Sequence, residues 1–194
     1  MFYVVKEYVL FHQDLAVKKF MAKNVFIAGA PGIGKTSLIS RLYRDLTPLF
    51  IRGFYKEEIQ EYQILKGYRL ATFDFQELIL AHVHIVGPDR LGEFGLNLDG
   101  FNNLIKKQLK PDPEVELFLI DEIGLMECTS IQFRKMIKKI LNSSIPLIAT
   151  LPSHDVLDIL KIKERKDIAL INMTFKNRDS LWKNVMVEIS KPSP

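Results

Sequence analysis

The chain has 194 residues, which suits one domain with a buried core and is too short for two large domains. Hydrophobic residues make up 47% and charged residues 26%, and this balance excludes an intrinsically disordered or fibrous chain. Lysine and arginine outnumber aspartate and glutamate by 27 to 23, and the surplus is spread along the chain. The charge therefore permits a nucleic-acid partner but does not support one.

The sequence lacks the features of a membrane or secreted protein. No apolar run approaches the ~18 residues that span a bilayer, and Lys6 and Glu7 interrupt the apolar N-terminal stretch. The single cysteine, Cys128, cannot form an internal disulfide and does not have the spacing of a zinc ligand. We therefore expect a cytoplasmic protein that has no membrane partner and acts as a monomer.

Residues 1–20 precede the regular pattern of the chain. Phe2–Phe11 is rich in β-branched and aromatic residues, whereas Asp14–Phe20 is equally compatible with the start of a helix. An upstream extension, an edge strand and a packing arm all stay open for this segment. We treat residues 1–20 as an N-terminal extension and residues 21–194 as one domain.

Four apolar runs predict buried strands, and each is followed by a helical pattern. The strands are expected at Asn24–Ala30, Leu117–Asp121, Ile145–Leu151 and Ile168–Thr174. The helices are expected at Lys35–Leu46, at Ser130–Leu141, after a cap at Ser153 or Asp155, and after a cap at Asn177 or Asp179. Apolar strands that alternate with helices predict an α/β three-layer domain with a mostly parallel central sheet.

The segment after the first helix has a different pattern. Glycines and aromatic residues are scattered among β-branched segments, which predicts a β-hairpin insertion over Arg52–Phe75 with its turn near Lys66–Gly67. Gly87–Pro88 then breaks the chain. A helix is expected over Leu98–Leu109 and should end before the prolines that follow it.

The most informative segment is a glycine-rich loop that fits the pattern G-x-x-x-x-G-K-[ST]. A chance match in a chain of this length is roughly a 1% event, and the loop has the expected strand before it and an amphipathic helix after it. Its glycines let several backbone N–H groups surround a phosphate, and the helix N-terminus adds a positive dipole. We therefore predict a P-loop that binds nucleotide, rather than a glycine-rich turn with an exposed lysine. The residues predicted to bind are Gly29, Ala30, Pro31, Gly32, Ile33, Gly34, Lys35, Thr36 and Ser37.

Two acidic residues at the end of the second apolar strand complete the predicted chemistry. Lys35 is expected to neutralise the β- and γ-phosphates, and the Thr36 hydroxyl and Asp121 are expected to hold Mg²⁺. Glu122 can orient and deprotonate an attacking water. Two solvated acids at a strand end are the plain alternative. The P-loop elsewhere in the chain favours the catalytic interpretation, with Lys35, Asp121 and Glu122 as its residues.

A guanine-specific switch protein is an alternative that the sequence speaks against. Asp121-Glu-Ile-Gly124 fits the D-x-x-G pattern of small GTPases, but no N-K-x-D or T-K-x-D segment follows anywhere in the chain. Without that segment the sequence offers no residues for specific recognition of the guanine base, so this interpretation is not favoured.

Several motifs together resemble the cancer-related nucleoside triphosphatases and their archaeal and bacterial relatives, first described as thermophile nucleotide phosphatases. The motifs occur in the order of that family, they span about residues 23–190, and the D-E-I-G-x-M-E run is the most specific of them. They are Gly29–Thr36, Arg52–Ile59, Gly92–Gly95, Asp121–Glu127, Ala149–Thr150 and Asn177–Asp179. The resemblance implies a compact P-loop fold that slowly hydrolyses nucleoside triphosphates to diphosphate and phosphate, with magnesium and little base selectivity.

The resemblance has gaps. The family often has threonine where Lys56 stands, its chains usually begin near Met21, and residues 70–89 match poorly. The first 20 residues and the hairpin contact therefore inherit nothing from it. Two further residues carry open alternatives: Thr150 is a γ-phosphate sensor or a buried threonine bonded to backbone, and Arg178 flanks the base or caps the surface.

Two other functions share this loop chemistry. A nucleotide or nucleoside kinase would need an arginine-bearing lid, and residues 85–100, with Arg90 and the glycines at 87, 92 and 95, are a candidate. A nucleotide-gated binding protein, for example one that acts on RNA, is the other. The sequence contains no basic stripe with interleaved aromatic residues to favour it.

Overall fold

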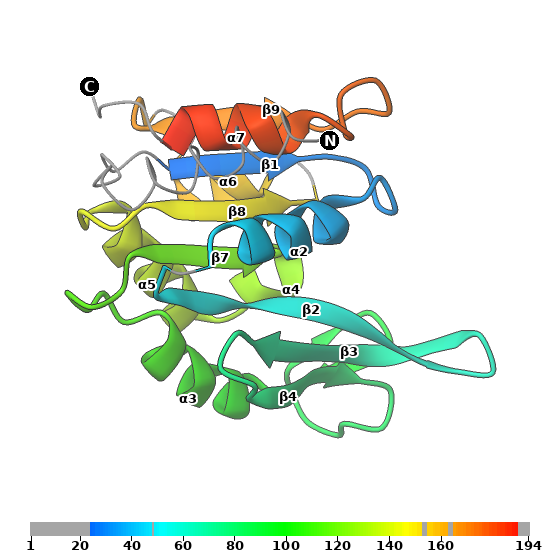
Figure 1. Ribbon diagram of the computed structural model, residues 1–194. Helices are drawn as coiled ribbons and strands as arrows, with labels where there is room; N and C mark the ends of the chain where they lie inside the picture. Colours follow the sequence, from blue (N-terminus) through cyan, green and yellow to red (C-terminus); the bar gives the residue numbers. More distant parts are fainter. Residues whose placement is uncertain (1–23, 48, 153–154, 163–164, 190–194) are drawn as a thin grey trace.

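The computed structural model describes residues 24–47, 49–152, 155–162 and 165–189. In this part of the chain nine strands form a single sheet, in the order β5-β6-β4-β3-β2-β7-β8-β1-β9 (Figure 1). The expectations for residues 1–20 and for a cap at Ser153 lie outside the described residues. The strands are β1 (Asn24–Ala28), β2 (Ile51–Glu61), β3 (Ile64–Thr72), β4 (Glu77–His82), β5 (Arg90–Leu91), β6 (Phe94–Leu96), β7 (Leu117–Asp121), β8 (Leu147–Leu151) and β9 (Ile168–Asn172).

The core of the sheet is parallel, as the sequence predicts. β2 pairs with β7, β7 with β8, β8 with β1 and β1 with β9, all in parallel. β7 has its predicted bounds, and β1, β8 and β9 are slightly shorter than expected. Because parallel strands end at the same edge of a sheet, the segments that follow β1, β7 and β8 lie at one edge, and β2 runs past this edge into the hairpin (Figure 1).

The antiparallel part of the sheet is larger than the predicted hairpin. β2 and β3 form the hairpin, but its turn lies at Tyr62 and Gln63, which have φ of 50° and 64°, and not near Lys66–Gly67. Gly67 lies inside β3, where a Cβ atom would come within 2.2 Å of the Ala81 carbonyl oxygen of β4. The glycine thus marks a close approach between strands, and the turn itself has no glycine to reveal it.

The candidate lid segment forms strands of this antiparallel part. β5 and β6 pair with each other, and β6 pairs with β4. The Arg90 guanidinium donates to the carbonyl oxygens of Ile85 and Glu93, so it holds its own loop. Among the described residues, those that line the two pockets reported below do not include Arg90.

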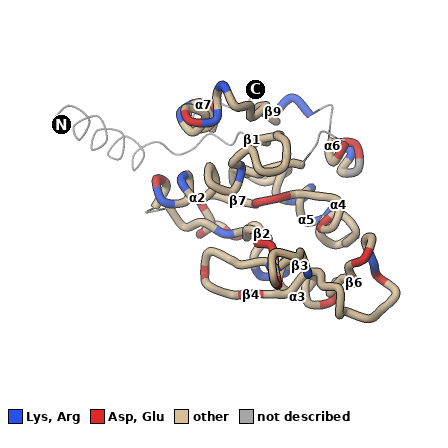
Figure 2. The backbone as a smooth tube through the Cα atoms, turned by 90° about the vertical axis from the view of Figure 1, so that its right-hand side faces the viewer, with Lys and Arg blue, Asp and Glu red and all other residues tan. Residues whose placement is uncertain are grey.

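Helices cover both faces of the sheet and complete the predicted three layers. Figure 2 shows α2 and α7 on one side, with α4, α5 and α6 on the other. Alternate strand residues face opposite ways: Val25 and Ile27 join the core under α2 and α7, whereas Phe26 and Ala28 join the core on the other face. The helices are α2 (Lys35–Asp45), α3 (Leu98–Gln108), α4 (Leu125–Cys128), α5 (Ile131–Leu141), α6 (Asp155–Leu160) and α7 (Leu181–Ile189).

Local capping explains where several helices begin. Asn97 and Ser130 accept hydrogen bonds from the backbone N–H groups of Gly100 and Phe133, so they cap α3 and α5. Asn177 has a different role from the predicted cap of α7. Its side chain accepts from the Thr174 N–H and donates to the Asn172 carbonyl oxygen, both at 2.8 Å, and so closes the turn between β9 and α7.

No helix in the described part of the chain is both long and apolar enough to cross a bilayer.

The contact between β2 and β7 depends on a glycine. Gly53 has φ of 136°, and a Cβ atom there would lie 1.9 Å from the Leu119 carbonyl oxygen. We expect Gly53→Ala to lower the free energy of unfolding by at least ~3 kcal/mol, because both the backbone conformation and the strand contact would be strained. Chemical denaturation measures this. Gly87→Ala, at a glycine with open space around it, is the control and should stay within ~0.5 kcal/mol of the parent. Equal losses in the two variants would contradict the prediction.

Candidate active site

The predicted P-loop connects β1 to α2 with the geometry of a phosphate-binding loop. Gly32 and Gly34 have φ of 72° and 111°, a region that other residues rarely adopt. Gly34 lies directly before the first residue of α2, so the free N–H groups of the helix N-terminus open at the end of the loop. This arrangement offers an anion both backbone donors and the helix dipole.

The Lys35 ammonium group lies inside the loop. Its Nζ atom donates to the carbonyl oxygens of Gly29, at 2.8 Å, and Ala30, at 3.3 Å. The Glu122 carboxylate is 3.7 Å away. Lys35 is 8% exposed, so its charge is concentrated where a phosphate would enter.

Asp121 ends β7 almost fully buried and is held by hydroxyl groups. Thr150 of β8 donates to its Oδ1 atom, and Thr36 of α2 also hydrogen-bonds to the carboxylate. Burial raises the pKa of Asp121 above its ordinary value, and the hydrogen bonds from Thr150 and Thr36 only partly offset this. The carboxylate is thus oriented beside the P-loop.

Glu122 belongs to a chain of alternating charges. The Nζ atom of Lys56 lies 3.3 Å from Glu122 and 3.1 Å from Glu127. Glu127 is fully buried, and its second oxygen accepts the Gly124 N–H at 2.9 Å. Glu127 therefore caps α4 and also braces the loop after β7.

These groups surround one pocket of about 640 Å³. Most of its wall comes from the P-loop, the end of β7 and the β2–β3 hairpin. Eight of the predicted site residues line it, namely Pro31, Gly32, Gly34, Lys35, Thr36, Ser37, Asp121 and Glu122, together with Lys56, Glu57, Glu58, Tyr68 and Pro152. The structure thus brings together the P-loop and the carboxylates, which lie about 90 residues apart in the sequence.

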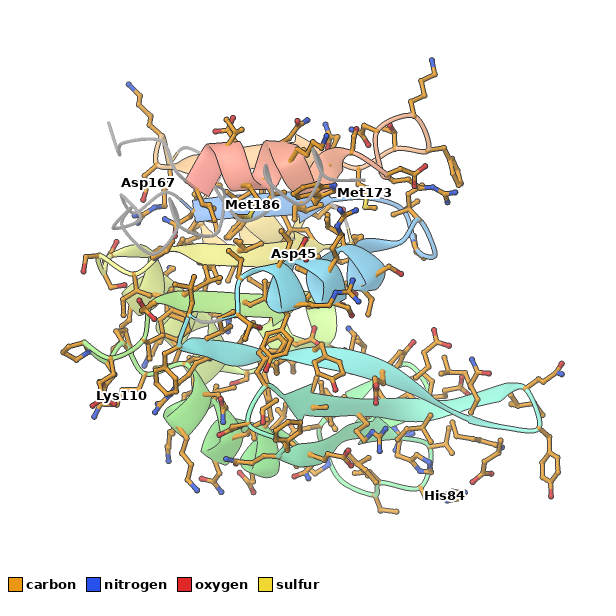
Figure 3. All side chains as sticks on the ribbon, viewed as in Figure 1. Asp45, His84, Lys110, Asp167, Met173 and Met186 are labelled. Carbon is orange, nitrogen blue, oxygen red and sulfur yellow. The ribbon has the colours of Figure 1, made fainter. Side chains whose placement is uncertain are left out.

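A second pocket, of about 350 Å³, adjoins the first one between α2 and α7. Gly34 and Ser37 line both pockets. Trp182, Met173 and Ile33 give the second pocket apolar walls, and Figure 3 shows Met173 at the same end of the sheet as the P-loop. The pocket has the lining expected of a site for a flat, partly polar ring.

Arginines border this second pocket. The Arg41 guanidinium stacks over the Trp182 ring at 4.1 Å, and Arg178 also lines the pocket while it pairs with Asp179 at 3.3 Å. Arg178 is thus close to the P-loop, as the base-flanking interpretation requires. It is half exposed, and its ion pair with Asp179 is also compatible with a surface role.

The remaining predicted residues lie behind the pockets. Gly29 and Ala30 act through their carbonyl oxygens, which hold Lys35. Thr150 is fully buried, and the described lining of the larger pocket does not include it. Its hydroxyl donates to the Asp121 carboxylate, a contact that orients Asp121.

Several residues of these pockets were not among the predicted site residues, and four of them are cationic or aromatic. Lys56 and Tyr68 come from the hairpin, and Arg41 and Trp182 come from α2 and α7. The alternation of β2 could have signalled Lys56, since Phe54 on the same face of the strand is a core residue. Trp182 is partly buried against the core under α2 and α7. The sequence of α7 alone does not show that this tryptophan lines a pocket.

Three further residues lie outside the described linings of the two pockets. Cys128 is buried, and burial raises the pKa of its thiol to about 12, so it stays protonated. His82 and His84 contact each other edge to face at 5.0 Å, and neither lines a pocket in the described part of the chain.

The donor set beside the P-loop suits a hard divalent cation. Thr36 and Asp121 offer a hydroxyl and carboxylate oxygens, which are the ligands that Mg²⁺ prefers. Among the described residues, there is no group of three or more histidine, cysteine or acidic side chains that could hold a metal ion by itself. A site of this kind fits a cation that takes most of its ligands from water and phosphate.

The comparisons with known proteins agree with this geometry. A family model described as NTPase matches residues 24–186. Nucleoside-triphosphatase THEP1 of Thermotoga maritima is 36% identical over 164 residues, which cover 84% of this chain and 93% of the relative. The cancer-related nucleoside-triphosphatase homolog of Mus musculus is 29% identical over 185 residues, which cover 87% and 97%.

Solved structures support the same assignment. The crystal structure of THEP1 from Aquifex aeolicus matches with a TM-score of 0.71 at 26% identity, covering 87% of this chain and 99% of that one. The solution structure of a human cancer-related nucleoside triphosphatase matches with a TM-score of 0.71 at 27% identity, covering 86% and 96%. With the P-loop, the paired carboxylates and the order of motifs already established, the chain belongs to the NTPase family that its motifs resemble.

Proposed function

We propose that this chain hydrolyses nucleoside triphosphates, ATP, GTP and others, to nucleoside diphosphate and inorganic phosphate in the presence of Mg²⁺. The observation that carries the proposal is the convergence of Lys35, Thr36, Asp121 and Glu122 on one pocket at the mouth of the P-loop. The names of the relatives, which are nucleoside-triphosphatases, support the same reaction.

The residues divide the work of phosphoryl transfer between binding and water activation. The loop N–H groups and Lys35 neutralise the charge of the β- and γ-phosphates. Glu122 orients a water and accepts one of its protons, while the water oxygen bonds to the γ-phosphorus. The bond from this phosphorus to the bridging oxygen breaks, and the diphosphate leaves with that oxygen. Glu122 is 21% exposed, so water can reach its carboxylate.

Thr36 and Asp121 are the residues that would hold Mg²⁺, which when bound adds positive charge to the phosphate oxygens. The Thr36 hydroxyl lies at the first turn of α2, directly after Lys35. The Asp121 carboxylate is hydrogen-bonded both to the Thr36 hydroxyl and to the Thr150 hydroxyl, which fixes its orientation beside Thr36. The protein thus prepares two oxygen ligands before any nucleotide is present.

The second pocket is where we place the base of the nucleotide. It shares Gly34 and Ser37 with the phosphate pocket, so a nucleotide can extend from one into the other. Trp182 offers a flat aromatic surface and Met173 an apolar side chain for contact with a base. Stacking of this kind accepts every base, because each has an aromatic face. This supports a broad substrate range.

The direct test is phosphate release from purified protein, measured with malachite green for each common ribo- and deoxyribonucleoside triphosphate. We expect release with Mg²⁺ and no added acceptor, little release with EDTA, and a decrease in kcat of at least ~100-fold in Lys35→Ala, because the charge on the phosphates would be lost. Lys106→Ala on α3 is the control and should match the parent. Formation of nucleoside diphosphate only when a nucleotide or nucleoside acceptor is added, without free phosphate, would indicate a kinase. Release only with RNA would indicate a nucleotide-gated binder.

The role of Glu122 can be separated from binding with a substitution of the same shape. We expect Glu122→Gln to retain nucleotide binding in calorimetry while kcat decreases ~100-fold or more, because the amide cannot accept the proton of the attacking water. Glu114→Gln, at an exposed acid far from the pocket, is the matched control. Equal losses of binding and of kcat in Glu122→Gln would show that this carboxylate has only a structural role.

The raised pKa of Asp121 predicts how stability changes with pH. The folded state holds the Asp121 proton more tightly than the unfolded chain, so this group's contribution to stability decreases as pH rises from the ordinary aspartate pKa through the raised one. In EDTA we therefore expect Asp121→Asn to have a higher Tm than the parent at pH 8. This difference should shrink as pH falls below the ordinary aspartate value. Thermal unfolding followed by circular dichroism tests this, and a lower Tm for the variant at pH 8 would contradict it.

A further inference from the structure

Lys56 occupies a place in the phosphate pocket that the proposed reaction does not yet use. The parallel register sets Tyr55 of β2 opposite Asp121 of β7, so the next residue on each strand, Lys56 and Glu122, lie beside each other. β2 continues past the end of β7 into the hairpin, and this extension forms a wall of the pocket. Lys56 is therefore held by backbone pairing at the edge of the sheet where the P-loop opens.

The Lys56 side chain is mostly buried and fully charged. It is 14% exposed. Burial alone would lower the pKa of Lys56, but the charges of Glu127 and Glu122 outweigh this effect and raise it. The ammonium group also lies 5.4 Å from the Tyr68 ring centroid, on the pocket side of the hairpin. A positive charge is thus maintained in a partly dry site, where it acts more strongly than at the surface.

Glu122 lies between two ammonium groups. Its Oε1 atom is 3.3 Å from the Lys56 Nζ atom, and its Oε2 atom is 3.7 Å from the Lys35 Nζ atom. Two cations on the two oxygens of one anion are the arrangement that a terminal phosphate group, with its three oxygens, would also satisfy. The carboxylate therefore marks a site between Lys35 and Lys56 that suits an anion.

The charges of the pocket explain why a second cation is needed. Lys35 and Lys56 are the basic side chains among the described residues that line it, whereas Glu57, Glu58 and Glu122 also line it. The Glu57 carboxylate is paired with the Arg69 guanidinium of β3 at 2.6 Å. Without Lys56, the acids on the hairpin side would repel the most charged end of a triphosphate.

We propose that Lys56 is a specificity-determining cation for the terminal phosphate, which contacts the γ-phosphate opposite Lys35 and lets the site distinguish nucleoside triphosphate from diphosphate. This inference rests on the proposed function. Lys56 is then a catalytic residue supplied by the chain's own hairpin, because charge on the γ-phosphate oxygens must be stabilised as its bridging bond breaks. Its contact with Glu122 lets phosphate binding and the orientation of the attacking water depend on each other.

A purely structural role is the competing explanation. Glu127 is fully buried, and Lys56 is its cationic partner, so Lys56→Met would leave a buried carboxylate unpaired and could unfold the protein. The double variant Lys56→Met/Glu127→Gln removes both charges together. A glutamine oxygen can still accept the Gly124 N–H that Glu127 accepts now. The double variant therefore keeps the cap of α4 and leaves no buried carboxylate unpaired, while it removes the Lys56 charge from the pocket and from Glu122.

The experiment compares the parent, Lys56→Met, Lys56→Arg and the double variant, with Lys66→Met as the matched control. Lys66 lies on β3 of the same hairpin and does not line the pocket in the described part of the chain. Calorimetry measures the affinity of each protein for ADP and for an ATP analogue that resists hydrolysis, both with Mg²⁺. Phosphate release gives kcat, and thermal unfolding identifies variants that do not fold.

We expect the double variant to fold, to bind ADP within ~2-fold of the parent, to bind the triphosphate analogue ~10-fold more weakly, and to lose ~100-fold in kcat. Lys56→Arg should recover part of both losses, and Lys66→Met should match the parent. A double variant that keeps the parent's ratio of triphosphate to diphosphate affinity would overturn the inference. If the parent releases no phosphate, but the double variant still binds the triphosphate analogue more weakly than the parent does, the inference stands and the proposed hydrolysis fails.

Discussion

The parallel pairing of β2, β7, β8 and β1 is the constraint on which the site depends. Backbone hydrogen bonds between these strands set Tyr55 opposite Asp121 and Ile27 opposite Thr150, so β1, β7 and β8 end together at one edge and β2 continues past it. The P-loop begins at that edge, and Thr150 reaches Asp121 across the strand pair β7–β8. Groups far apart in the sequence are thus positioned by main-chain pairing, which side-chain substitutions change little.

The site collects carboxylates at a place meant for a polyanion, and each carboxylate has a partner that makes this possible. Asp121 is buried but bonded to hydroxyl groups. Glu127 is buried deeper, and it is satisfied by the Gly124 N–H and by Lys56. Glu122 alone keeps some exposure to solvent and lies between two ammonium groups. The acids therefore differ in environment, and in the mechanism we propose this separates the roles of metal ligand, brace and base.

Much of the fold was predictable because its signals are local. The P-loop, the four apolar strands and the helices after them depend on spacings within about ten residues, and the structure confirms their positions. The hairpin turn was misplaced because Tyr62 and Gln63 carry no turn signal, while Gly67 serves a strand contact instead. The short strands β5 and β6 were missed because two or three residues are too few to show a period.

The sequence by itself determined that a phosphate-binding loop opens the first helix, and that two acids end a buried strand of the same sheet. Only the tertiary structure decided that Lys56 meets Glu122 and Glu127, which are 66 and 71 residues away, and that Trp182 faces the P-loop helix. A local pattern sets which face of a strand or helix is apolar. The order and register of the strands, which arise from the packing of the whole chain, set which side chains meet.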